Sequence, residues 1–273
     1  MLRMESETGW WLITHPDHAR LAGAFASAWG NAQFRKPEPR ARVLHGIATH
    51  DDGWAARDAH PCITREGKPS AFSTELVGKY SAFEEIDLAE YLAVRERAVR
   101  IVAEQDPYAG LLIAMHTYNL LTAHADRSTI AADQLPLLDV FLDSQRAYQQ
   151  ELVARIEGDD SLTPIEKDAD TVLEHFRLLQ ACDNLSLLSC VDFASPANLL
   201  HPLPQNGGGA VEIQVVPIAS RRFRLEPWPF VGDDVSFQFP ARHVSGHRFA
   251  SHGDLETVFA LAPVESLEVK LSK

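Results

Sequence analysis

The stretch VLHGIATHDDGW, residues 43–54, decides the fold, because it places an adjacent histidine and aspartate at the end of a short apolar helix. We expect this helix to run from about Arg42 to Asp51 and to stop near Gly53. Imidazole nitrogens and carboxylate oxygens together suit Fe, Mn, Zn or Ni. The pair His50-Asp51 therefore predicts a metal site at a helix end, to which other helices contribute further ligands.

Three other segments with helical periodicity carry side chains of the same kinds. His18 lies at the start of the first expected helix, for which Asp17 is a good N-cap residue. Asp183 lies within a long apolar segment, where an unpaired buried charge would be expensive. His116 lies inside another apolar helix, where both a structural role and a ligand role are open. The expected metal ligands are His18, His50, Asp51, His116 and Asp183.

Periodicity divides the rest of the chain into a helical part and a part rich in short strands. Helices are expected over residues 17–31, 42–51, 84–105, 107–124, 134–157 and 163–192. Strands are expected over residues 211–217, 222–226, 235–239 and 265–271, with a short helix over 255–261. Residues 10–13 form a strand or a lead-in, and residues 57–83 a long loop.

These elements predict a mainly α protein with a small C-terminal β-rich element. The expected domains are a helical metal-binding core over residues 1–195 and a β-rich appendage over residues 196–273, packed on that core.

The composition excludes several classes of function. The formal net charge of −13 argues against a nucleic-acid binder and against docking on an anionic membrane. A small anionic substrate remains compatible with this charge, because a metal ion reverses the local sign of the field. The chain shows no signal peptide and no long apolar stretch, so we expect a cytoplasmic protein, and a homodimer is left open. Cys182 and Cys190 are expected to be free core residues.

The order of the motifs resembles that of a known superfamily. A histidine, then a His-Asp pair, then an aspartate, each on its own helix, is similar to the HD superfamily of metal-dependent phosphohydrolases. The sequence motifs resemble even more closely those of an uncharacterised bacterial family of this length. The shared patterns lie at Asp17–Gly23, His50–Trp54, Met115-His116, Asp183–Leu187 and Pro227–Phe230.

This resemblance implies an HD-like helical bundle that hydrolyses a phosphate ester or anhydride of a small molecule or nucleotide with a divalent transition metal. Asp51 or Asp52 would orient the attacking water, and His116 would hold a second ion or the leaving phosphate. The residues considered for binding the phosphate are Arg20, Arg57, Lys68 and Lys79.

Two alternatives stay open. A di-iron oxygenase would need further histidines in addition to His116, and the candidates considered for them are His124 and His175. A metal-containing ligand sensor would need no turnover. His15 and His45 are expected to be outside the first coordination sphere.

Overall fold

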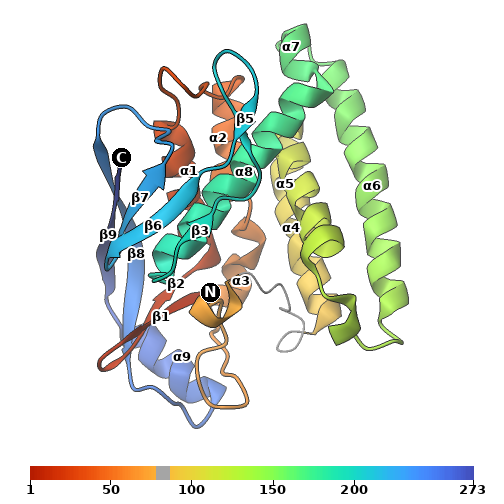
Figure 1. Cartoon of the computed structure of the whole chain (residues 1–273). Helices are drawn as coiled ribbons and strands as arrows, with labels where there is room; N and C mark the ends of the chain where they lie inside the picture. The colour runs from red at the N-terminus through yellow and green to blue at the C-terminus, as the bar shows by residue number, and fades with distance from the viewer. Residues whose placement is uncertain (78–86) are drawn as a thin grey trace.

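The computed structural model describes residues 1–77 and 87–273, except for the side chain of His124. Its strands lie beside a group of long helices, with α1 and α8 next to the sheet and α6 farthest from it (Figure 1). The strands are β1 Leu2–Ser6, β2 Gly9–Ile13, β3 Ala197–Asn198, β4 Leu203–Pro204, β5 Ala210–Val211, β6 Gln214–Ala219, β7 Arg222–Glu226, β8 Asp234–Ser245 and β9 Val264–Ser272.

The helices that matter for the site come mainly from the first two thirds of the chain. The α-helices are α1 His15–Ala28, α2 Arg40–Thr49, α3 Ala55–Asp58, α4 Leu88–Gln105, α5 Pro107–Asn119, α6 Leu135–Glu157, α7 Pro164–Lys167, α8 Ala169–Cys190 and α9 His252–Leu261. The shorter helical turns are η1 Asp52–Trp54, η2 Thr74–Leu76, the π-turn η4 Leu120–His124 and η5 Arg127–Thr129.

Seven of the strands form one sheet in the order β1-β2-β8-β9-β7-β6-β3. Neighbouring strands pair antiparallel except β7 and β9, which are parallel. The two longest strands, β8 and β9, lie side by side near the centre, and β4 and β5 form a separate pair. The sheet therefore takes strands from both ends of the chain.

The expectation of a mainly α protein with a small β element is wrong: the protein is a mixed α/β structure with a substantial sheet. Two features escaped the sequence pattern. β1 is a short strand that pairs with β2 across a tight turn, and β8 extends from Asp234 to Ser245, well beyond the expected residues 235–239. β8 pairs with β2, and β1 also bridges to Phe72; both contacts are distant in the sequence, so local alternation does not report them.

Most of the expected helices are present with shifted ends. Thr14 caps α1 and accepts a hydrogen bond from the amide of Asp17, so Pro16 lies in the first turn, where its missing N–H costs nothing. The segment expected as one helix over 163–192 is broken at Asp168, which caps α8. α4 begins at Leu88, and the expected start at residues 84–86 lies outside the described residues.

The sheet shares its main core with the helices. On one face, strand side chains pack with α1 and α8, and the rings of Phe25 and Phe237 meet edge to face at 4.8 Å. On the other face, α9 covers Trp10, Leu12 and Val244. Alternate residues of β2 thus contact different cores, as the two-residue period of a strand requires. Cys182 and Cys190 are free and buried, as expected.

Two glycines allow the close approaches that build the site. A Cβ at Gly23 of α1 would lie 2.6 Å from the Cβ of Ala48 in α2. A Cβ at Gly53 would lie 2.4 Å from the carbonyl oxygen of Val94 in α4. Real Cβ atoms do not tolerate such contacts. Glycine at position 53 therefore lets the turn after His50-Asp51 pack directly on α4.

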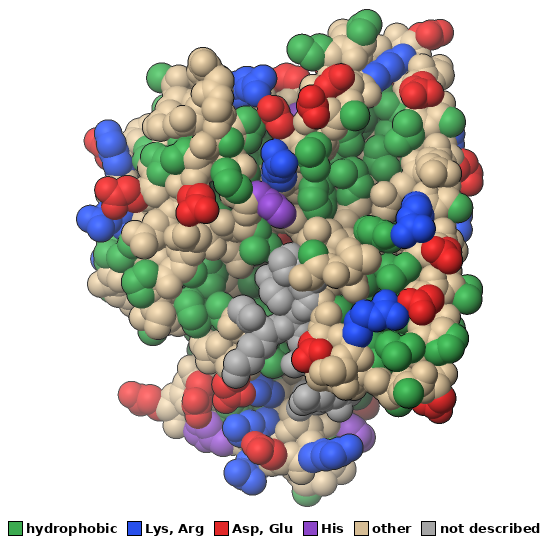
Figure 2. Space-filling model, turned by 45° about the vertical axis from the view of Figure 1, so that its right-hand side comes forward, with side chains coloured by type: hydrophobic (Ala, Val, Ile, Leu, Met, Phe, Trp, Pro, Cys, Tyr) green, Lys and Arg blue, Asp and Glu red, His purple; other side chains and the backbone are tan. Residues whose placement is uncertain are grey.

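The outer surface mixes charged and apolar side chains. Figure 2 shows acidic and basic groups interspersed over one face of the molecule, with apolar side chains exposed between them. Exposed apolar residues on α6 include Leu137, Val140 and Val153. Among the described residues, none of the helices is long and apolar enough to span a membrane.

Candidate metal site

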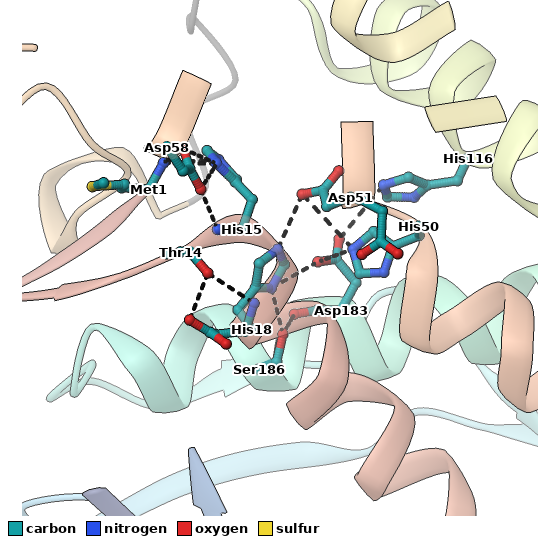
Figure 3. A network of polar contacts seen from close by, with 12 residues as sticks. Met1, Thr14, His15, His18, His50, Asp51, Asp58, His116, Asp183 and Ser186 are labelled. Carbon is teal, nitrogen blue, oxygen red and sulfur yellow. Dashed lines mark hydrogen bonds and ion pairs between the residues drawn. The ribbon is translucent and has the colours of Figure 1, made fainter. Parts of the chain in front are cut away.

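Five ionisable side chains from four segments of the chain meet in the interior (Figure 3). His18 comes from α1, His116 from α5 and Asp183 from α8, while His50 and Asp51 directly follow α2. All five are between 1 and 6 % exposed. The structure thus brings together every residue that the sequence predicted as a metal ligand.

His50 is oriented by the end of its own helix. Its Nδ1 donates a hydrogen bond to the carbonyl oxygen of Ile47 at 2.7 Å. Its Nε2 then faces the Oδ1 of Asp183 at 3.2 Å. An imidazole whose Nδ1–H is bound to a backbone carbonyl presents the lone pair of Nε2, which is the usual arrangement of a metal-binding histidine.

His18 is oriented in the same way by a hydroxyl group. The hydroxyl of Ser186 donates to the carbonyl oxygen of Asp183 at 2.8 Å. Ser186 Oγ, 2.9 Å from the Nδ1 of His18, can therefore only accept from it. The Nε2 of a neutral His18 then presents a lone pair to Asp51 Oδ2, 3.0 Å away.

The centre of the site consequently consists of acceptors. Two imidazole nitrogens and two carboxylates converge, and only protons or a cation between them can relieve their mutual repulsion. The ligand atoms of His18, His50 and Asp51 lie within 4.8 Å of one another, and so do those of His50, His116 and Asp183. Atoms about 2.1 Å from one ion are at most about 4.2 Å apart. A small contraction would close either group on an ion, so these residues fit a transition metal.

The pKa shifts of the buried groups also indicate that a positive charge stabilises the site. Burial by itself would lower the pKa of His50, but the carboxylates of Asp51 and Asp183 outweigh it and raise that pKa to about 9. Burial would raise the pKa of Asp51, yet Arg95 and His50 hold it well below its usual range. The same opposition, led by His50, lowers the pKa of Asp183. A proton on His50 thus supplies the charge that an ion would supply.

His116 completes the site on the side of α5. Its Nε2 lies 3.8 Å from Asp183 Oδ2, beyond hydrogen-bond distance. Its buried Nδ1 has no hydrogen-bond partner among the described residues. Burial lowers its pKa to about 3, so the ring is neutral and able to ligate. Unlike a satisfied core histidine, His116 retains unused bonding capacity.

Asp52 does not join this group. Arg20 binds it through both carboxylate oxygens at 2.8 and 2.9 Å on the surface of the molecule. Asp52, considered for orienting the attacking water, and Arg20, considered for binding the phosphate, therefore both lie away from the expected ligands.

The other basic residues considered for phosphate binding also have partners elsewhere. Arg57 lies 3.7 Å from Glu90, and Lys68 lies 3.3 Å from Glu66. Lys79 lies outside the described residues.

Two other histidines that the sequence brought into question, His15 and His175, have structural partners. His15 is bound to Asp58 through its backbone amide and its ring and stacks on Trp54 at 4.4 Å. His175, a considered ligand for a second metal, has its Nδ1 2.7 Å from the hydroxyl of Tyr108. The side chain of His124 is outside the described part of the structure.

A family model matches residues 1–246 of the chain, and the family is described as a protein of unknown function, DUF3891. The chain belongs to the DUF3891 family. The matched region of this DUF3891 protein contains all five expected ligands and stops just after β8. No curated protein and no solved structure matches the chain.

Arg95 is the residue of this DUF3891 site that the motif analysis missed. Its Nη1 donates to Asp51 Oδ1 at 2.6 Å from the middle of α4. The signal was present in the helix itself: Tyr91, Ala98 and Val102 are buried at helical spacing, and Arg95 falls on the same face. A charged residue in the apolar stripe of a helix requires a buried partner, here a candidate ligand.

Proposed function

We propose that this protein is a metal-dependent hydrolase that acts on a phosphate ester or anhydride of a small molecule or nucleotide. The observation that carries the proposal is the convergence of the Nε2 atoms of His18 and His50 on two buried carboxylates, with each Nδ1 committed to another partner. The resemblance of the His, His-Asp, Asp order to the HD phosphohydrolases supports the reaction class.

In this proposal His18, His50, Asp51 and Asp183 hold one divalent transition metal, Fe, Mn, Ni or Zn. Such an ion supplies a Lewis acid and lowers the pKa of water from about 15.7 toward about 7. Ser186 and the Ile47 carbonyl hold the two imidazoles in the ligating tautomer. In this proposal Asp51 orients the attacking water, because it is buried with the ligands while Asp52 pairs with Arg20 at the surface.

Among the described residues, the arrangement offers no carboxylate that two ions could share. The two groups of candidate ligands share only His50. Its Nδ1 donates to a backbone carbonyl, so the ring has a single lone pair to offer. A di-iron oxygenase would require a ligand common to both ions, and in the present arrangement neither carboxylate belongs to both groups.

The test is phosphatase and phosphodiesterase activity of the Mn²⁺-loaded protein toward p-nitrophenyl phosphate, bis-p-nitrophenyl phosphate and nucleotides. We expect hydrolysis that disappears in Asp183→Asn and persists in Arg20→Ala. One bound ion per chain with no hydrolysis of any phosphate substrate would contradict the proposal and leave the ligand-sensing alternative.

A further inference from the structure

Arg95 is a buried cation in contact with the candidate metal site. It is 8 % exposed, and its ion pair with Asp51 Oδ1 is 2.6 Å long. Its Nε lies 3.1 Å from the hydroxyl oxygen of Tyr91. A buried charge of this kind is costly unless it has partners. A guanidinium has five N–H donors, and Asp51 accepts a hydrogen bond from it with only one of its two oxygens.

Two aromatic rings fix the guanidinium in place. Its central carbon lies 5.4 Å from the ring centre of Trp54 and 5.2 Å from that of Tyr91. Contacts of this type orient arginine without consuming its N–H groups. Among the described residues, Arg95 Nη2 makes no hydrogen bond, and the buried Nε1 of Trp54 has no partner either.

The charge of the site depends on whether a metal is bound. The two carboxylates of Asp51 and Asp183 and the guanidinium of Arg95 sum to a charge of −1 before any proton or ion in the site is counted. Ligation requires the imidazoles to be neutral. A divalent ion therefore turns the same site into one with a single net positive charge, in a buried environment where that charge attracts an anion strongly.

We propose that Arg95, held between Trp54 and Tyr91, forms an oxyanion subsite for the phosphoryl group of the substrate, and that this subsite binds an anion only when the metal is present. The inference rests on the proposed function. Planar guanidinium groups match the spacing of phosphate oxygens. Asp51 offers one oxygen to Arg95 and the other to the ligand cluster, so the guanidinium lies next to the residues that would hold the ion.

Inorganic phosphate is the probe for the test. Its binding to the Mn²⁺-loaded full chain is measured by ³¹P line broadening and by calorimetry, and Mn²⁺ affinity is measured separately. Arg95→Met should weaken phosphate binding about 10- to 100-fold, the range expected for lost hydrogen bonds to a charged group. Mn²⁺ affinity should be unchanged or higher, because Asp51 is released. Arg57→Met is the matched control, since Arg57 also approaches the Trp54 ring, at 6.0 Å, but pairs with Glu90.

The outcomes separate this inference from the proposed function. Equal phosphate affinity in Arg95→Met and wild type, or equally tight binding without Mn²⁺, would overturn the inference alone. Parallel loss of Mn²⁺ and phosphate would also overturn it, by showing that Arg95 only holds Asp51. A wild-type protein that binds no Mn²⁺ would overturn both. Arg95→Lys, which keeps the charge without the planar fork, should show an intermediate phosphate affinity and provides a second variant if the methionine variant does not fold.

Discussion

Replacing Asp183 with asparagine should abolish the thermal stabilisation that a divalent metal gives this protein. Asparagine keeps the shape of the side chain but removes the charge that lies 3.2 Å from His50 Nε2 and 3.7 Å from His18 Nδ1. Because Asp183 lies near both imidazoles, we expect its replacement to weaken metal binding more than it lowers the stability of the metal-free protein.

The expected magnitude follows from linkage. A metal at 100 times its Kd stabilises the folded state by about 2.7 kcal/mol. In proteins of about 150–250 residues each kcal/mol shifts Tm by about 2–4 °C, and the same range applied to this chain of 273 residues gives wild type a gain of about 5–10 °C. Changing residues that merely orient metal ligands costs about 10- to 100-fold in affinity, and loss of a ligand should cost at least about 100-fold. The same metal concentration would then equal Kd, and the gain would fall to about 0.4 kcal/mol, or about 1 °C.

The assay is thermal unfolding followed by circular dichroism, with Mn²⁺ and with EDTA. Asp58→Asn is the matched control, because Asp58 is also a buried carboxylate but binds His15 instead of the ligand cluster. That variant should have a lower Tm without metal and the full gain with it. An equal gain in wild type and Asp183→Asn would refute the reasoning.

Three further predictions concern pH, packing and the surface. Since the pKa of His50 is raised to about 9, its protonation stabilises the metal-free protein fully below about pH 6.5, and this contribution is lost as pH rises through about 9. A metal replaces that proton, so metal affinity measured by competition with a chelator should rise about tenfold per pH unit from pH 7 to 9, and a flat profile would contradict this. Gly53→Ala should lower stability by about 1–3 kcal/mol in urea unfolding, because its Cβ would meet the Val94 carbonyl at 2.4 Å; unchanged stability would show that the turn can shift freely. Asp52→Ala breaks an exposed pair with Arg20 worth about 0.2–1 kcal/mol and should leave metal content unchanged, whereas a loss of metal would place Asp52 among the ligands.

The helices were predictable from the sequence because apolar periodicity and capping residues are local signals. Asp106-Pro107 starts α5 as expected, with the Asp106 carboxylate accepting from the amides of Tyr108 and Ala109. The sheet was not predictable in the same way. β1 is defined by partners that include Phe72 and β2, and its apolar-polar alternation extends over only five residues. Pairing between distant strands is a property of the whole chain, so the extent of the sheet could not be read from local patterns.

The ligand set was predictable because its residues are costly to bury without a function. Asp183 and His116 stand out in apolar helices, and both are at the site. Asp52 looked equivalent to Asp51, yet the turn after α2 directs it to Arg20 at the surface. Arg95 could not be predicted from metal-ligating residue types, because its signal is a charge within an apolar helix face.

The central claim is that one divalent metal is held by the buried His18, His50, Asp51 and Asp183. Elemental analysis of protein purified without a histidine tag tests it most directly, after loading with Mn, Fe, Ni and Zn in turn. We predict about one ion per chain in wild type and in His45→Ala, and almost none in His50→Ala. No bound metal in wild type under any of these conditions would contradict the claim and return the cluster to a buried ion-pair network.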